Sequence, residues 1–469
     1  MQVGIDGTII LKEQNMEDVR IEHDSMGEVE VPAEKHWGAQ TERSRRNFKI
    51  GQRMPEEVIQ AFAILKSAAA TANEDLGCLD NERANIIRNV CEEILSGSMG
   101  DEFPLVVYQT GSGTQTNMNV NEVIANRGNE LAGRRLLHPN DHVNMSQSSN
   151  DTFPTAMNIA AVMTMTGEMI PKAEKLRDAF AELEEKYADI VKVGRTHLQD
   201  ATPLTLGQEI SGWRSMLDHD IEMVLDSAEY LKELAIGGTA VGTGLNCPEG
   251  FDMKAAECIS RLTGIEFLTA ENKFHALTSR DAFVHCHGAL KALAADLMKI
   301  ANDIRLLASG PRCGVGELSI PANEPGSSIM PGKVNPTQCE AVTMVAARVM
   351  GNDVTIGIAA SQGNYELNVY APVIIYTFLE SVKLLAESMD SFCEHLVKGI
   401  KPVESTIKAN LEQSLMLVTA LSPHIGYENA AVIARKAFDE DTTLREAAIA
   451  SGLVTAEDFD AWVVPEEMV

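Results

Sequence analysis

Residues 326–340 carry the side chains best suited to chemistry, and they read Gly-Ser-Ser-Ile-Met-Pro-Gly-Lys-Val-Asn-Pro-Thr-Gln-Cys-Glu. The Pro-Gly pair predicts a loop, and Pro336 before an apolar run predicts the start of a helix. Small residues let successive backbone N–H groups face a ligand and form an anion-binding concavity. Lys333 adds a positive charge, and Asn335 adds an amide donor on the same side of an extended segment. The stretch is therefore suited to binding a carboxylate or an oxyanion.

The spacing of this loop argues against nucleotide binding. The gap between Gly326 and Gly332 is one residue longer than a P-loop allows, and Val334 occupies the position of the serine or threonine that binds magnesium. The plain alternative to an anion site is a surface loop with an incidental lysine.

Two polar stretches nearer the N-terminus could also hold an anion. Residues 109–119 read Gln-Thr-Gly-Ser-Gly-Thr-Gln-Thr-Asn-Met-Asn, a loop before a helix that offers hydroxyl and N–H donors. Residues 138–151 gather His, Asn, Asp and Ser ahead of another helix. Taken alone, both stretches are more typical of helix caps and turns.

His197 lies in a polar break, residues 194–201, between long apolar helices. A lone histidine is more often structural than catalytic. Thr196 and Gln199 beside it, and an anion-binding loop elsewhere in the chain, favour a functional role. The glycine-rich residues 237–246 lack dinucleotide-binding spacing after a strand and are more typical of a packing turn.

The eight cysteines predict neither disulfides nor a metal centre. None forms a C-x-x-C pair, and no cluster has zinc or iron–sulfur spacing, so reduced thiols are expected. His285-Cys286-His287 looks like a metal-binding tract, but residues i and i+2 of a helix point to different faces. We therefore expect no metal and no cofactor.

The elements that must position these residues are mainly helical. Apolar residues recur at three and four from 55 to 97, which predicts two helices broken near Gly77, and residues 28–32 alternate like a short strand. Helices of this kind pack side by side as a bundle, within or between chains. Long helical periodicity predicts five further helices, Met165–Ala188, Thr205–Leu234, Ser279–Ala308, Pro336–Ile358 and Leu367–Val397.

The pattern of helices predicts three domains. We expect an N-terminal domain at 1–145, a central long-helix bundle at 146–404 and a small helical domain at 405–469, where the periodicity shortens. Residues 1–17 are expected to be a flexible extension or the product of an upstream start codon.

Composition limits the function classes. The net charge of −29 over 469 residues argues against nucleic-acid binding. No apolar run reaches about 18 residues, and the N-terminus lacks a targeting signal, so the expected location is the cytoplasm. Repulsion of an anionic substrate is screened beyond about 8 Å, whereas a lysine about 4 Å from a carboxylate contributes about 4 kcal/mol. Local charge therefore decides anion binding.

The loop at 326–340 resembles the signature loop of the fumarase/aspartase superfamily, whose core is Ser-Ser-x-Met-Pro-x-Lys-x-Asn. Gly332 and the run Thr-Gln-Cys-Glu at 337–340 resemble the class II, metal-independent fumarases in particular. The opening near residue 21 and the three polar stretches match the same family in order, so the resemblance covers about residues 21–469. It implies a mainly α, three-domain fold and a homotetramer, in which central domains form a multi-helix core and three subunits build each active site.

The resemblance also implies roles for individual residues. Those implied to bind substrate are Ser112, Thr114, Ser148, Ser149, Asn150, Thr196, Lys333 and Asn335. Those implied in catalysis are Ser327, His197, Glu340 and Lys333. A second dicarboxylate site of uncertain role is implied at His138, Asn140 and Asp141.

The implied reaction is the reversible anti hydration of fumarate to (S)-malate through an aci-carboxylate. Removing the C3 proton of malate places two negative charges on the adjacent carboxylate, which preorganised donors such as Lys333 and Asn335 would stabilise. The family assigns the base to Ser327, whose alkoxide needs backbone N–H donors and the nearby lysine. His197, paired with Glu340, would protonate the departing hydroxyl, and the reverse assignment with histidine as base stays open.

Aspartate ammonia-lyase is the nearest alternative, because it shares the loop but expels ammonia. Gly332, the run 337–339 and the Gly-Thr-Gln triplet at 113–115 favour a fumarase. Argininosuccinate and adenylosuccinate lyases need room for larger substrates. An inactive structural homologue is disfavoured because the implied catalytic residues are all present, and an iron–sulfur fumarase is disfavoured by the cysteine spacing.

Overall fold

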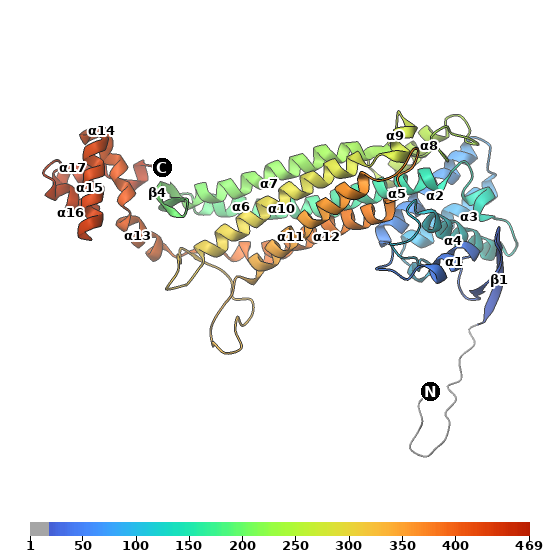
Figure 1. Ribbon diagram of the computed structural model, residues 1–469, viewed down its shortest axis with the longest axis horizontal. Helices are drawn as coiled ribbons and strands as arrows, with labels where there is room; N and C mark the ends of the chain where they lie inside the picture. Colours follow the sequence, from blue (N-terminus) through green and yellow to red (C-terminus); the bar gives the residue numbers. More distant parts are fainter. Residues whose placement is uncertain (1–17) are drawn as a thin grey trace, which may run out of the picture. The chain divides into compact units, whose positions relative to one another are not determined.

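Long α-helices dominate the computed structural model of the protein, which describes residues 18–469 (Figure 1). These residues belong to two units. The first contains residues 18–164, Ala228–Val284 and Thr355–Leu379, and the second contains Met165–Ser227, His285–Val354 and Glu380–Val469. The predicted mainly α fold is confirmed, whereas the division into three sequential domains stays a prediction. The expected extension at 1–17 lies outside the described residues.

The first unit combines short strands with packed helices. Its elements are β1 (Val19–Asp24), β2 (Gly27–Pro32), α1 (Ala39–Asn47), α2 (Glu56–Asp75), α3 (Asn81–Leu95), α4 (Thr114–Ala132), α5 (Ser149–Thr164), β5 (Glu233–Leu234), α8 (Phe251–Thr263), β6 (Leu268–Thr269) and α9 (Lys273–Thr278). The predicted strand at 28–32 and the predicted helix break near Gly77 are both confirmed. Strand β1, which pairs antiparallel with β2, was not predicted.

The second unit contains most of the longest helices. Elements lying wholly or mostly in it are α6 (Ile170–Lys186), β3 (Val191–Thr196), β4 (Gln199–Thr205), α7 (Leu206–Ala228), α10 (Asp281–Leu307), β7 (Leu318–Ser319), α11 (Thr337–Ala360), α12 (Ala371–His395), β8 (Lys401–Pro402), α13 (Glu404–Gln413), α14 (Ser422–Ile425), α15 (Tyr427–Glu440), α16 (Leu444–Ala450) and α17 (Ala456–Trp462). The five predicted long helices correspond to α6, α7, α10, α11 and α12. None of the helices in residues 18–469 combines the length and apolar character needed to span a bilayer.

Helix α2 is the buried centre of the first unit. It contacts α3, α4, α5 and α8, and most of its buried positions are alanine or another apolar residue. Phe62 of α2 meets Phe153 of α5 edge-on, with ring centroids 5.8 Å apart. Alanine keeps neighbouring helices close to α2, so any long side chain at its core positions requires a specific partner.

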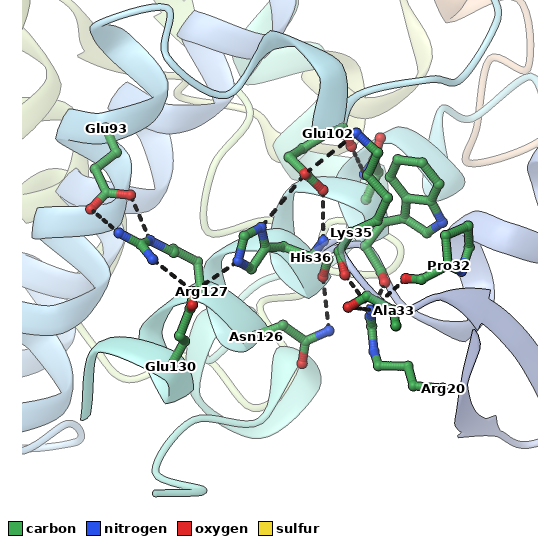
Figure 2. A network of polar contacts seen from close by, with 12 residues as sticks. Arg20, Pro32, Ala33, Lys35, His36, Glu93, Glu102, Asn126, Arg127 and Glu130 are labelled. Atoms are coloured by element: carbon green, nitrogen blue, oxygen red, sulfur yellow. Dashed lines mark hydrogen bonds and ion pairs between the residues drawn. The ribbon is translucent and has the colours of Figure 1, made fainter. Parts of the chain in front are cut away.

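A network of ion pairs fixes the segment between β2 and α1 against the neighbouring helices (Figure 2). His36 Nε2 lies 2.9 Å from Glu130 Oε2 of α4, and His36 Nδ1 lies 3.6 Å from Glu102 Oε1. Arg127 of α4 contacts Glu130 at 2.6 Å and Glu93 of α3 at 2.8 Å. Glu130 therefore joins the histidine and the arginine into one network.

We expect the stability of the first unit to depend on the charge of His36. The neighbouring Glu102 carboxylate raises the pKa of His36 above the ordinary value of 6.5, although burial opposes this rise. The stabilisation is therefore complete below the unfolded-state pKa and is lost as pH rises through the folded-state pKa. His36→Gln should flatten the dependence of the unfolding free energy on pH above the ordinary value of 6.5, an effect of less than about 1 kcal/mol for a partly exposed pair.

Urea denaturation followed by circular dichroism at several pH values measures this effect. His23→Gln is the matched control, because the exposed His23 pairs with exposed Glu28 at 3.7 Å and should leave the pH dependence unchanged. Identical pH dependence in wild type and His36→Gln would contradict the prediction.

The long helices α6, α7, α10, α11 and α12 pack along one another as a bundle (Figure 1). Trp213 of α7 meets Phe180 of α6 edge-on at a centroid distance of 5.9 Å, and its indole N–H donates to Asp303 of α10 at 3.1 Å. Lys175 of α6 pairs with Asp390 of α12 at 2.6 Å. The side chains that join the bundle are thus aromatic rings inside and ion pairs at its surface.

The helices after residue 404 surround a separate hydrophobic cluster of the second unit. Its buried members include Leu421, Ile433, Leu444 and Phe459, and also Val193 of β3. The β3–β4 hairpin, which follows α6 in the chain, is therefore anchored at its base by the C-terminal helices.

Candidate functional site

The first unit brings together three hydroxyl groups that the sequence predicts to bind substrate. Thr114 Oγ1 lies 2.8 Å from Ser112 Oγ and 2.8 Å from Ser149 Oγ. Thr114 is the first residue of α4 and Ser149 is the first residue of α5, so two helix N-termini meet here. Helix N-termini carry partial positive charge, and together with hydroxyl donors they favour an anion.

Two glycines allow the loop before α4 to lie in close contact with Phe153 and Val369. A Cβ at Gly113, whose φ is +72°, would lie 2.0 Å from the ring of Phe153. A Cβ at Gly111 would lie 1.6 Å from the carbonyl oxygen of Val369. Any side chain at either position would force the loop before α4 away from its neighbours.

The neighbouring segment at 148–151 is tied to the glycine-rich turn. The Asn150 N–H donates to Ser148 Oγ at 3.2 Å, and the Asn150 side chain donates to the Ala240 carbonyl at 2.8 Å. Asp151 is buried and accepts from the N–H groups of Ser148 at 2.9 Å and Gly237 at 3.0 Å. The glycine-rich turn therefore positions the predicted substrate-binding residues, in addition to packing.

The predicted second-site residues share one short turn. Asn140 and Asp141 lie in a π-helical turn, Pro139–Val143, directly after His138. His138 Nδ1 accepts from the Asp141 N–H at 3.2 Å, and both Asn140 and Asp141 are exposed. The turn gathers the three side chains, and their binding of a dicarboxylate stays a prediction.

In the second unit, residues 326–336 form a closed loop. The Gly326 N–H donates to the Lys333 carbonyl at 2.8 Å, and Asn335 Nδ2 donates to the Gly326 carbonyl at 2.8 Å. A Cβ at Gly326 would lie 2.7 Å from the Lys333 carbonyl oxygen, so this closure requires glycine. Helix α11 begins directly after Pro336, as predicted.

Ser327 lies inside this loop with its hydroxyl oxygen facing backbone donors. Ser327 Oγ accepts from the N–H groups of Met330 at 3.0 Å and Ile329 at 3.3 Å. Ser327 is half-buried, whereas Lys333 in the same loop is exposed. N–H groups directed at one oxygen favour its charged form, which is the support that a serine base requires.

His197 lies at the tip of the β3–β4 hairpin, where the sequence predicted only a break between helices. His197 and Leu198 both adopt left-handed backbone angles, with φ of 57° and 61°. Two-residue hairpin turns of this type usually carry asparagine or glycine, and a leucine with positive φ is strained. Strained backbone of this kind is concentrated at functional sites, and the His197 side chain is exposed.

A buried carboxylate anchors this hairpin. Glu317 lies 2.6 Å from Arg195 Nη2 and 3.2 Å from Lys192 Nζ, and it accepts from Asn410 of α13 at 3.0 Å. Burial acts to raise the pKa of Glu317, but the Arg195 hydrogen bond and the Lys192 charge outweigh it, so the pKa is lowered. No local sequence pattern indicates this anchor, because only Arg195, two residues before His197, lies within a recognised motif.

Some residues that the sequence predicts to act together are not in contact within the second unit. Among the described residues of that unit, no hydrogen bond or ion pair connects His197 to Glu340 or Lys333. Glu340 is exposed in the first turn of α11, and Thr196 is exposed beside His197. The His197–Glu340 pair therefore stays a prediction.

Cys286 and His287 of the tract at 285–287 lie in the bundle interior, whereas His285 is exposed. His287 is buried, with Nδ1 3.1 Å from Asp353 Oδ1 and Nε2 2.9 Å from Ser381 Oγ. No group of three or more His, Cys, Asp or Glu side chains within 18–469 has the arrangement of a metal site. The eight cysteines are free thiols, and burial raises the pKa of Cys339, beside Glu340, to about 12.

Comparisons with known proteins agree with this arrangement of motifs. A family model described as Lyase matches residues 27–351, and a model described as Fumarase C C-terminus matches residues 417–469. Fumarate hydratase class II of Bacillus subtilis (strain 168) is 61% identical over 457 residues, which cover 96% of this chain and 99% of that protein. Fumarate hydratase class II of Helicobacter pylori (strain J99) is 60% identical over 456 residues, with 96% and 98% covered.

The similarity extends to three-dimensional structure. The crystal structure of recombinant class II fumarase from Schistosoma mansoni matches with a TM-score of 0.94 at 43% identity, and the match covers 96% of this chain and 99% of that chain. The two family models match different parts of the chain, and each of these relatives covers 96% of it. The chain therefore belongs to the class II fumarate hydratase family of lyases.

Proposed function

We propose that the protein catalyses the reversible hydration of fumarate to (S)-malate. The observation that carries this proposal is the loop at 326–336, in which the Ser327 hydroxyl faces two backbone N–H groups and Lys333 lies on the same closed loop. The identity of 61% to a fumarate hydratase class II supports the same reaction.

In the proposed mechanism, Ser327 removes the C3 proton of malate as an alkoxide. The N–H groups of Met330 and Ile329 stabilise the charge on its oxygen before the reaction. The electrons of the broken C–H bond move onto the adjacent carboxylate, and Lys333 stabilises the resulting aci-carboxylate. The intermediate then expels the hydroxyl on the opposite face, and His197 supplies the proton that converts it to water.

The remaining residues of the proposed site hold the substrate and support the histidine. Substrate carboxylate binding is assigned to the hydroxyl and amide groups at 112–114 and 148–150, with Thr196 and Asn335 as further donors. Glu340 is assigned the role of carboxylate partner of His197. A separate dicarboxylate site is assigned to the turn that carries His138, Asn140 and Asp141.

We extend the proposal to the assembly. The protein acts as a homotetramer in the cytoplasm, with the three-domain division at about residues 145 and 404 and with active sites shared between subunits. The exposure of both His197 and Glu340 supports this arrangement, because a partner subunit can bring a carboxylate to the histidine.

We expect purified protein treated with a metal chelator to form fumarate from (S)-malate but not from aspartate. The reaction is followed by the ultraviolet absorbance of fumarate, with the two substrates in parallel. Chelator leaves the rate unchanged, because the proposed mechanism uses only protein groups. Fumarate from aspartate alone would identify an ammonia-lyase, and no product from either would reject the proposed reaction.

A further inference from the structure

A buried lysine contacts the turn at 144–147, which directly precedes the segment at 148–150 proposed to bind the substrate carboxylate. Lys66 is fully buried in the alanine-rich part of α2, within the first unit. Its ammonium donates to Gln147 Oε1 at 2.9 Å and to Asn144 Oδ1 at 3.1 Å. Burial lowers the pKa of Lys66 to about 7. A lysine at such a position is costly to bury, so its partners need to be specific.

The acceptors of Lys66 belong to the turn that precedes Ser148. Asn144 Oδ1 also accepts from Asn117 and Asn121 of α4, each at 3.1 Å, so one oxygen connects α2, α4 and this turn. Gln147 Nε2 donates back to the Met145 carbonyl at 2.9 Å. The lysine thus contacts both ends of residues 144–147.

The same turn is strained and needs external support. Ser146 has a φ of 65°, which is unfavourable for a residue with a side chain. Asn73 of α2 holds it by accepting from Ser146 Oγ at 2.7 Å and by donating to the Met145 carbonyl at 3.1 Å. Side chains of α2 therefore determine the path of the backbone into Ser148.

On the far side of Ser148, a buried carboxylate fixes the backbone. Asp151 accepts from the N–H groups of Ser148 at 2.9 Å, Thr239 at 2.9 Å and Gly237 at 3.0 Å. Its burial raises its pKa to about 6, and the positive charge of Lys66 acts in the opposite direction. The buried Lys66 thus contacts the chain directly before residues 148–150, and the buried Asp151 follows directly after them.

We propose that Lys66 is a positioning residue, whose buried ammonium holds the turn at 144–147 and so orients Ser148, Ser149 and Asn150 toward the substrate carboxylate. This inference rests on the proposed function of those three residues. Methionine of similar length at position 66 would leave Gln147 Oε1 without its donor, and a misplacement of the segment by about 1 Å can lower catalytic efficiency by up to about 10²-fold.

The test compares Lys66→Met with Lys254→Met in the full-length protein. Lys254 of α8 pairs with Asp75 of α2 at 3.3 Å, and within residues 18–469 no hydrogen bond or ion pair joins Lys254 to the turn. Lys66→Met should raise the KM for malate about 10-fold or more with a kcat change of less than about 3-fold, because a lost binding interaction acts on KM. Hydrogen exchange at the amides of 146–150 should also become faster, whereas Lys254→Met should match wild type in both measurements.

The two measurements separate this inference from the proposed function. If wild type does not act on malate, the proposed function fails, and hydrogen exchange alone decides whether Lys66 holds the segment. A folded Lys66→Met protein with wild-type KM and wild-type exchange overturns the inference. If Lys66→Met does not fold, Gln147→Met removes the same contact from the turn and is judged by the same two criteria.

Discussion

Ser327→Ala is expected to lower kcat for malate dehydration by about 10²- to 10⁴-fold, the contribution typical of a positioned general base. In the proposed mechanism the Ser327 Oγ carries the negative charge, which the N–H groups of Met330 and Ile329 stabilise. Alanine removes this oxygen. Binding of malate should change little, because Lys333 and the donors of the first unit remain. Steady-state kinetics of wild type and variant measure the effect.

Ser328→Ala provides a control of identical chemistry at the adjacent position. Ser328 is exposed, and it is assigned no part in the proposed reaction, so its replacement should change kcat by less than about 3-fold. Circular dichroism should show both variants folded like wild type. Near-wild-type turnover by Ser327→Ala would remove Ser327 from the role of base and transfer that role to His197.

Glu317→Ala is expected to destabilise the second unit by about 3–5 kcal/mol, as is typical when one member of a buried ion pair is removed. Glu317 has no exposed surface, and its loss leaves Lys192, which is 1% exposed, with only Glu209 as counter-ion at 2.9 Å. Arg195 loses its bidentate partner. Chemical denaturation gives the change in unfolding free energy directly.

The stabilisation by Glu317 also has a defined pH dependence. Because its folded-state pKa is lowered, the contribution is present above the ordinary pKa of 4.5 and is lost as pH falls through the folded value. Glu412→Ala is the control, since Glu412 pairs with Lys408 at 3.8 Å with both side chains exposed. That variant should change the unfolding free energy by less than about 0.5 kcal/mol. A cost below about 1 kcal/mol for Glu317→Ala would show that the anchor is dispensable.

Local patterns explain why much of the fold could be predicted. The helical repeat in residues 165–188 and 367–397 is a property of neighbouring residues, and it produced bounds close to those of α6 and α12. Pro336 predicted the start of α11 to within one residue, because proline suits the first turn of a helix and disfavours helical structure before it. The Pro-Gly pair at 331–332 likewise predicted a loop, and the closure of that loop admits no Cβ at Gly326.

The β3–β4 hairpin could not be predicted in the same way. Its turn places His197 and Leu198 at positive φ without the glycine or asparagine that usually marks such a turn. A bulge between Val193 and Arg195 also interrupts the alternation that would indicate a strand. Local propensity is therefore misleading here, and contacts made far away in the sequence hold the turn.

Motifs and periodicity are carried by adjacent residues, so they indicated the family, most of the helices and the residue types of the proposed site. The groups that support these residues became visible only in the folded chain. Glu317 lies 122 residues from the Arg195 that it binds, and Lys66 lies 81 residues from Gln147. A buried charge needs a partner, and that partner can lie far away in the sequence, so no local sequence pattern indicates the pairing.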